Sequence, residues 1–297
     1  MGESRAYRLK VSEPLPAEVT RVARGRIDHA VDELRGKSGS TPEEAVHEAR
    51  KDMKKLRALL RLSRDELGKA TYGRENACFR DAARELAGTR DSDVMLEALG
   101  ALDLPPGAGW ELRKAIQAER EHGGEDGRAA AARAAVAILK EARGRIDDWP
   151  LERDSFGAVA GGLERTYRRG RRGFRTASEA PAVESLHEWR KRIKDLWYHH
   201  TLLRRLWPPV MTAVGDQAHD LSDLLGDDHD LAMLAGWMRE HAPAAGPEFF
   251  EAVERRREEL QREALALGAL LYAEKPSAFV GRLELLWNTR KTEVRAP

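Results

Sequence analysis

The sequence contains one pattern twice, and the pattern has the spacing of an amphipathic helix. Each copy has a histidine, then arginine and lysine three and four residues later, a second lysine at seven and leucine at nine; the copies begin at His47 and His187. At 100° per residue, the histidine, the arginine and both lysines fall within about 100° of the helix circumference. The apolar residues of each copy lie on the other side. Two helices with cationic polar faces predict a site for a long, negatively charged ligand.

Helical patterning continues over the whole chain. Ala, Leu, Glu and Arg are abundant and aromatic residues make up only 6% of the sequence, a composition that favours helices over strands. The segment Thr41-Pro42-Glu43-Glu44 indicates a helix start, with Thr as N-cap and Glu at the third helical position. The periodicity predicts helices over residues 16–35, 41–67, 72–101, 109–147, 155–178, 182–206, 211–241 and 247–273, with a short last helix after Pro276.

The eight main helices form two sets of four in the same order. We therefore expect an all-α fold of two four-helix bundles related by internal pseudo-two-fold duplication, with the short extra helix at the C-terminus. The first bundle would span residues 1–150 and the second residues 151–297. A chain of 297 residues is long enough for two such units.

Composition excludes several classes of protein. The 51 Lys and Arg residues are balanced by 50 Asp and Glu, so the distribution of charge, and not its total, must indicate the partner. The single cysteine, Cys78, excludes an intramolecular disulfide and a cysteine-based zinc cluster. The N-terminal residues lack the apolar stretch of a signal peptide, and no long apolar run is present. We expect a soluble, cytoplasmic protein with no membrane partner.

More basic residues extend the two cationic faces. Arg61 and Tyr198 lie near the azimuth of the histidine of their copy, and Arg57 lies further round. Nearby acids such as Glu48 and Glu188 lie to one side, so we expect the faces to lack neutralising partners. Like charges at i,i+4 destabilise a helix by tenths of a kcal/mol, roughly 0.2–0.5 per pair. Because that cost is present twice, an anion site is favoured over a merely solvated face.

A third basic segment, residues 165–175, holds six arginines and no acid. Tyr167 and Phe174 fall on its opposite, apolar side. If these helices turn their basic faces the same way, the combined surface is a trough, and planar guanidinium groups suit phosphate oxygens. The residues assigned to this extension of the site are Arg165, Arg168, Arg169 and Arg172, with Arg21 and Arg24 as a thinner counterpart before the first copy.

Catalytic and metal chemistry is less well supported. Neighbouring cations should lower the pKa of His47 and His187, so a neutral imidazole that donates to a phosphate is preferred. The clusters Asp91-Ser92-Asp93 and Asp227-Asp228-His229-Asp230 either hold a divalent ion or pair with Arg and Lys, and pairing is favoured. No nucleophile–base pair, glycine-rich phosphate loop or zinc signature is present. We predict no catalytic residue, no metal and no cofactor.

The doubled H-x-x-R-K-x-x-K-x-L pattern, with Arg90-Asp91-Ser92-Asp93 in the first half, resembles the CHAD family, the histidine α-helical domain. The resemblance covers the chain from Tyr7 to the last helix, as one CHAD domain. It implies two four-helix bundles around a central basic surface that binds inorganic polyphosphate, and association with polyphosphate granules. It points to His47, Arg50, Lys51, Lys54 and Arg57, to His187, Arg190, Lys191 and Lys194, and to Arg165, Arg168, Arg169 and Arg172.

The sequence departs from the family pattern in three ways. Trp197 stands where the first copy has Arg57, so the second copy is one charge poorer. Asp227 replaces the arginine of the R-D-x-D pattern. The E-x-E-x-K motif of the triphosphate-tunnel domain that many relatives carry is absent, which indicates a stand-alone, non-catalytic form.

Long-chain polyphosphate is the ligand that the pattern favours. Single-stranded nucleic acid usually adds exposed aromatic side chains, worth about 1–3 kcal/mol per stacked base. Trp189, Tyr167 and Phe174 fall on apolar faces, which disfavours nucleic acid. Three alternatives stay open: a metal-dependent polyphosphatase or phosphotransferase that uses His47, His187, Asp91 and Asp228, a single-stranded nucleic-acid binder, and a basic scaffold for acidic proteins. The sequence does not indicate the oligomeric state.

Overall fold

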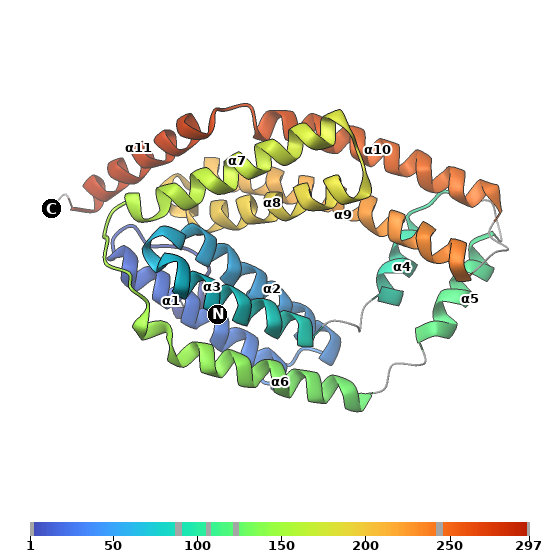
Figure 1. Cartoon of the computed structure of the whole chain (residues 1–297), viewed down its shortest axis with the longest axis horizontal. Coiled ribbons are helices and arrows are strands. Elements are labelled where there is room, and N and C mark those ends of the chain that lie inside the picture. Colours follow the sequence, from blue (N-terminus) through green and yellow to red (C-terminus); the bar gives the residue numbers. More distant parts are fainter. Residues whose placement is uncertain (1–2, 87–90, 105–107, 121–124, 242–245, 296–297) are drawn as a thin grey trace.

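The computed structural model describes residues 3–86, 91–104, 108–120, 125–241 and 246–295, and every regular element in these ranges is a helix (Figure 1). The all-α prediction is therefore confirmed. The α-helices are α1 (Leu15–Leu34), α2 (Pro42–Leu62), α3 (Arg64–Glu85), α4 (Asp91–Gly100), α5 (Ala108–Arg120), α6 (Glu125–Gly144), α7 (Gly157–Glu179), α8 (Val183–Leu202), α9 (Pro208–His241), α10 (Pro247–Leu271) and α11 (Pro276–Arg295). None of the helices in these ranges is long and apolar enough to cross a membrane.

The helix boundaries follow local chemistry at several points. Thr41 caps α2 as predicted: its side chain accepts from the Glu44 N–H at 3.3 Å, and Glu44 accepts from the Thr41 N–H at 2.9 Å. Gly68 has a φ of 70°, a left-handed conformation that suits glycine, and bends α3 near its start. Thr41 thus fixes the start of α2, and Gly68 changes the direction of the chain within α3.

Several predicted boundaries differ in the structure. The helix expected over 72–101 is two helices, α3 and α4, and the helix expected over 109–147 is also two, α5 and α6. Pro208 begins the 34-residue α9, since the missing proline N–H costs nothing in a first helical turn. The last helix, expected to be short, is α11, with 20 residues. It contributes the buried side chains Leu283 and Trp287 to the core.

Two hydrophobic cores hold the helices together. The main core joins α1, α2, α3, α6, α7, α8, the first half of α9, the end of α10, and α11, around large side chains such as Trp189 and Phe79. The second joins α4 and α5 to the end of α9 and the start of α10, through residues such as Leu99, Ile116 and Leu234. Both cores combine residues from before and after position 150. The division at that position and the internal duplication both stay predictions.

Two polar contacts join the C-terminal halves of α2 and α8. The His199 ring Nε2 lies 2.9 Å from the Ala58 carbonyl oxygen, and Arg61 bonds to Asp195 at 3.0 Å. Helix α7 crosses the end of α2 so closely that a Cβ at Gly162 would collide with the Leu62 carbonyl. The N-terminal halves of α2 and α8, which carry the repeated pattern, border a cleft.

Candidate functional site

The cleft has a volume of about 630 Å³ and is bordered by α2, α4, α8 and α9. Both copies of the repeated pattern contribute cations to it. The lining residues are Glu43, Glu44, Val46, His47, Glu48, Arg50 and Lys54 of α2, Val94 and Glu97 of α4, Arg190 and Lys194 of α8, and Asp223 and Asp230 of α9. The structure thus brings together five of the predicted site residues: His47, Arg50, Lys54, Arg190 and Lys194.

Lys194 shows how closely the two cationic faces approach. Its pKa is lowered to about 7, first by burial and then by the positive charges of Arg190 and Lys54. Asp223 and Asp230 oppose the shift but do not cancel it. A bound anion would favour the protonated lysine and relieve this repulsion. The positive charges of Lys54, Arg190 and Lys194 are therefore crowded together, in a cleft whose lining also holds six carboxylates.

Arg190 is placed by α9. Its Nε donates to the Ser222 carbonyl oxygen at 3.0 Å, and a Cβ at Gly226 would collide with its guanidinium group. The absence of a side chain at Gly226 lets the arginine lie flat against α9. Within the described residues, neither Arg190 nor Arg50 forms an ion pair with a carboxylate.

Acidic side chains also line the cleft, and most of them were not predicted to belong to it. Burial raises the pKa of Asp230, and burial followed by repulsion from Asp223 and Asp230 raises that of Asp227. The i, i+4, i+7 spacing of these three residues on α9 was a signal that could have found them. Glu97 reaches the cleft from α4, and no local pattern indicates that contact.

The expectation that the cationic faces lack neutralising acids is wrong at two positions. Lys51 bonds to Glu48 at 2.8 Å, and Lys191 bonds to Glu188. The bond from Lys191 lowers the pKa of Glu188. These pairs join residues three apart, not four, and they occur at the same place in both copies.

His187 is not among the described residues that line the cleft, and its ring contacts that of a second histidine. The ring centroids of His187 and His229 are 4.4 Å apart, and within the described residues the Nδ1 atom of each has no hydrogen-bond partner. The pKa of His187 is lowered to about 4, first by burial, then by His229, Lys191 and Arg190. The imidazole is neutral, as the sequence analysis expected, but burial is the main cause.

The other predicted residues on α2 and α8 have structural partners. Arg57 donates from Nε to Asn76 at 3.1 Å, and Arg61 joins α8 through Asp195. Tyr198 is 4% exposed and contacts Tyr7, and burial raises its pKa. The structure does not bring these three residues to the cleft.

The arginines assigned to α7 and α1 do not line the cleft either. Arg165 bonds to Asp65 at 2.8 Å, and Arg168 bonds to Glu164 at 3.0 Å. Arg169 and Arg172 are exposed on α7, with no ion pair among the described residues.

In α1, Arg21 bonds to Glu18 at 2.7 Å and Arg24 forms an ion pair with Asp147. Arg21 also donates to the Ala6 and Arg8 carbonyl oxygens. Both arginines therefore hold neighbouring segments of the chain. The predicted trough would have combined all the basic segments, but only α2 and α8 contribute cations to the cleft.

The residues considered for a metal are placed differently in the two halves. Asp228 is buried and accepts from Arg257 at 3.1 Å and from Gln261 at 2.7 Å, which agrees with the favoured pairing role. Arg90 and the side chains of Asp91 and Asp93 lie outside the described residues. In the part of the chain that is described, no group of three or more His, Cys, Asp or Glu could hold a metal ion.

Fold and cleft together define an all-α protein in which two histidine-bearing helices present arginine and lysine to one cavity. The chain belongs to the CHAD domain family, whose family model matches residues 21–239. It is similar to the crystal structure of the CHAD domain from the plant Ricinus communis, with a TM-score of 0.58 and 19% sequence identity over 90% of this chain and 94% of that one. At that identity the likeness shows the fold alone. A comparison with curated proteins found no match.

Proposed function

We propose that the protein binds inorganic polyphosphate in the cleft between α2 and α8, without transforming it. One observation carries the proposal: Arg50 and Lys54 of the first copy meet Arg190 and Lys194 of the second across one cavity. Polyphosphate is a flexible line of phosphates with about one charge per unit. Guanidinium and ammonium groups at several points along a cleft are the partners such a chain requires.

The lining favours polyphosphate over nucleic acid. Among the described residues that line the cleft, none is Trp, Tyr or Phe. A cleft without aromatic side chains lacks the stacking platform on which single-stranded nucleic acids gain much of their affinity. Trp189 and Tyr167 are buried in the main core, as expected from their apolar faces.

The carboxylates in the cleft limit how the ligand can lie. Six lining carboxylates would repel phosphate: Glu43, Glu44, Glu48, Glu97, Asp223 and Asp230. The ligand should therefore contact His47, Arg50 and Lys54 on one side and Arg190 and Lys194 on the other. Attraction at long range is therefore weak, and affinity comes from several contacts made together. Long chains should bind more tightly than short ones because neighbouring subsites act together.

Calorimetry with long-chain polyphosphate, tripolyphosphate and single-stranded RNA tests the ligand. We expect the long chain to bind best and its affinity to fall linearly with salt on a double-logarithmic plot, as counterion release requires. RNA that binds as well as polyphosphate of equal charge would contradict the preference. The absence of phosphate release over hours, with Mg²⁺ or Mn²⁺ added, is the expected result for a non-catalytic protein.

Charge reversal tests the site. The double variant Arg50→Glu with Arg190→Glu should lose polyphosphate binding while its circular dichroism stays helical. The matched control is the double variant Arg255→Glu with Arg262→Glu, at two exposed arginines of α10 that do not line the cleft, and it should bind as the parent does. Unchanged binding by the double variant would refute the site. Association with polyphosphate granules in cells, which the family resemblance implies, should be lost with the same double variant.

A further inference from the structure

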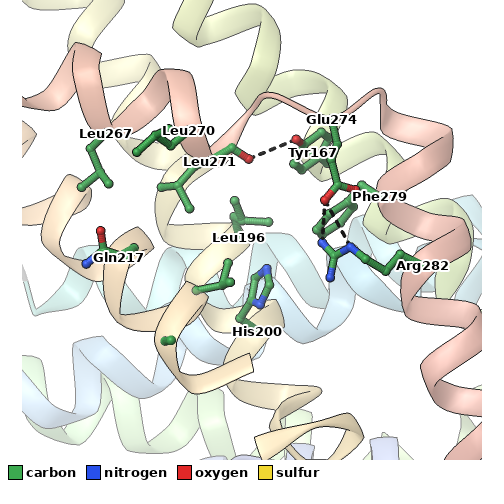
Figure 2. Close-up of a pocket in the computed structure, with 12 residues that line it drawn as sticks. Tyr167, Leu196, His200, Gln217, Leu267, Leu270, Leu271, Glu274, Phe279 and Arg282 are labelled. Atoms are coloured by element: carbon green, nitrogen blue, oxygen red, sulfur yellow. Dashed lines mark hydrogen bonds and ion pairs between the residues drawn. The ribbon is translucent and has the colours of Figure 1, made fainter. Parts of the chain in front are cut away.

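A second cavity lies among the helices of the C-terminal half (Figure 2). By helical spacing, its α8 residues Leu196 and His200 lie on a different face of that helix from Arg190 and Lys194. Its volume is about 310 Å³. It is lined by Tyr167 of α7, Leu196 and His200 of α8, Ala213, Val214 and Gln217 of α9, Leu267, Leu270 and Leu271 of α10, Phe279 and Arg282 of α11, and Glu274 between α10 and α11. None of these residues takes part in the proposed polyphosphate site.

The lining is mostly aromatic and aliphatic. Tyr167 and Phe279 stack with ring centroids 4.2 Å apart and planes within 10°. Figure 2 shows the leucines of α10 on one side of the cavity and these rings on the other, with His200 between α9 and α11. A cavity with flat ring walls and leucine side chains fits a planar, apolar molecule. Leu270, 76% exposed, marks its opening to solvent.

His200 is the polar group that this apolar lining leaves unsatisfied. It is 2% exposed, and neither ring nitrogen has a hydrogen-bond partner within the described part of the chain. Burial, aided by the positive charge of Arg282, lowers its pKa to about 3. The ring is therefore neutral and offers one N–H donor and one nitrogen acceptor. Buried polar groups of this kind are normally paired, so the missing partner points to a ligand or a bound water.

The remaining polar groups at the cavity are already paired. Arg282 bonds to Glu274 at 3.0 Å, so each of these charges already has a partner, and the Tyr167 hydroxyl donates to the Leu271 carbonyl at 3.0 Å. Gln217 donates to Asp220 at 3.1 Å. A charged ligand would lose its hydration without gaining an opposite charge. An uncharged ligand with a single hydrogen-bonding group matches what the cavity offers.

We propose that this cavity is a binding site for an uncharged aromatic compound of about two rings, whose one hydroxyl or amide group bonds to His200. The size follows from a simple comparison. An apolar cavity of about 150 Å³ holds benzene, and this one is about twice as large. The site would act independently of polyphosphate, because the two cavities have no lining residue in common.

Three matched probes test the proposed chemistry: 2-naphthol, naphthalene and 2-naphthoate. Calorimetry on the full chain should show 2-naphthol binding at one site, about fivefold more tightly than naphthalene, as one neutral hydrogen bond would give. The 2-naphthoate anion should bind more weakly than both. Nuclear magnetic resonance of the histidine rings should show the His200 signals moving with 2-naphthol. Binding by none of the probes, or 2-naphthol binding that leaves the His200 signals unchanged, would overturn the proposal.

Cavity-filling variants locate the site. Leu267→Trp should remove 2-naphthol binding and leave polyphosphate binding unchanged, whereas Leu285→Trp on the exposed face of α11 should leave both unchanged. If Leu267→Trp does not fold, Val214→Trp fills the same cavity from α9. Unchanged 2-naphthol affinity in a folded cavity-filling variant would refute the location. His200→Phe should bind naphthalene and 2-naphthol equally, and a retained preference for the hydroxyl would refute the role of the imidazole.

Discussion

Arg61 of α2 and Asp195 of α8 form a 3.0 Å ion pair that joins the two helices bearing the repeated pattern. Asp195 also receives Arg192 at 3.5 Å and is almost fully buried. The pair lies about two turns beyond Lys54 on α2 and beside Lys194 on α8. The pair holds α2 against α8 close to the cleft. Arg61 therefore has a structural role, whereas the other basic residues of the two helices named above, Lys54 and Lys194, line the cleft.

The first prediction concerns this pair. Asp195→Ala should lower the free energy of unfolding by about 2–3 kcal/mol, since it removes a charged hydrogen-bond acceptor and leaves Arg61 without it. Urea unfolding followed by circular dichroism measures the loss. Asp81→Ala, which breaks an exposed pair with Arg80 on α3, is the control and should leave the midpoint unchanged. Equal midpoints for the Asp195 variant and the parent would show that the pair does not hold α2 to α8.

The second prediction is that a change in the position of Arg190 weakens ligand binding without lowering the stability of the fold. Gly226→Ala should weaken polyphosphate binding by about tenfold, because the added methyl group displaces the Arg190 guanidinium and one charged hydrogen-bonding group is lost. The fold should not be destabilised, since alanine favours a helix over glycine by about 1 kcal/mol.

Gly236→Ala is the matched control for that experiment. Gly236 lies in the same helix and a Cβ there would meet nothing within 4 Å, so the change should stabilise the protein and leave affinity unchanged. Calorimetry and thermal unfolding of both variants make the comparison. Equal affinities for the two variants would show that Arg190 does not need its present position to bind the ligand.

The spacing of residues in the sequence predicted correctly which side chains share one face of a helix. The offsets of Arg50 and Lys54, and of Arg190 and Lys194, place each pair on one face of its helix whatever the rest of the chain does. That these faces border one cleft depends on contacts between α2 and α8, such as His199 to the Ala58 carbonyl, which join residues far apart in the sequence.

The predictions that are wrong concern side chains whose surroundings are also set by residues far apart in the sequence. Tyr198 has the azimuth of a basic face, but Tyr7 from the N-terminal segment covers it. Arg165 has the spacing of a site residue, but α7 packs where Asp65 of α3 can pair with it. Glu97 belongs to the cleft because α4 packs on α9. Each outcome is decided by a partner that no local pattern contains.

The third prediction concerns the acids that pair with the outer lysines. Glu188→Gln should free Lys191, and polyphosphate affinity should rise by about two- to fivefold, the range expected from a partly exposed ion pair. Glu48→Gln should act in the same direction, because it frees Lys51 and also removes a carboxylate from the lining of the cleft. Glu179→Gln, an exposed acid at the end of α7, changes the net charge equally and is the control. The idea fails if all three variants gain the same affinity, since the effect would then be one of net charge alone.

The fourth prediction is a proton taken up on binding. The pKa of Lys194 is about 7 in the free protein because of burial and the charges of Arg190 and Lys54. A polyanion in the cleft raises that pKa, since it stabilises the ammonium form. Below pH 7 the lysine is already protonated, so affinity changes little. Above pH 7 binding must add a proton, so affinity should fall as the pH rises from 7 to 9.

Calorimetry in two buffers with different ionisation enthalpies measures this uptake directly. At pH 8 about one proton should be taken up per bound site, and at pH 6 almost none from Lys194. Lys194→Arg should bind with little dependence on pH between 7 and 9, because a guanidinium group stays charged throughout this range. A parent protein whose affinity is as independent of pH as that of Lys194→Arg would show that Lys194 does not contact the polyanion, and would restrict the ligand to Arg50, Lys54 and Arg190.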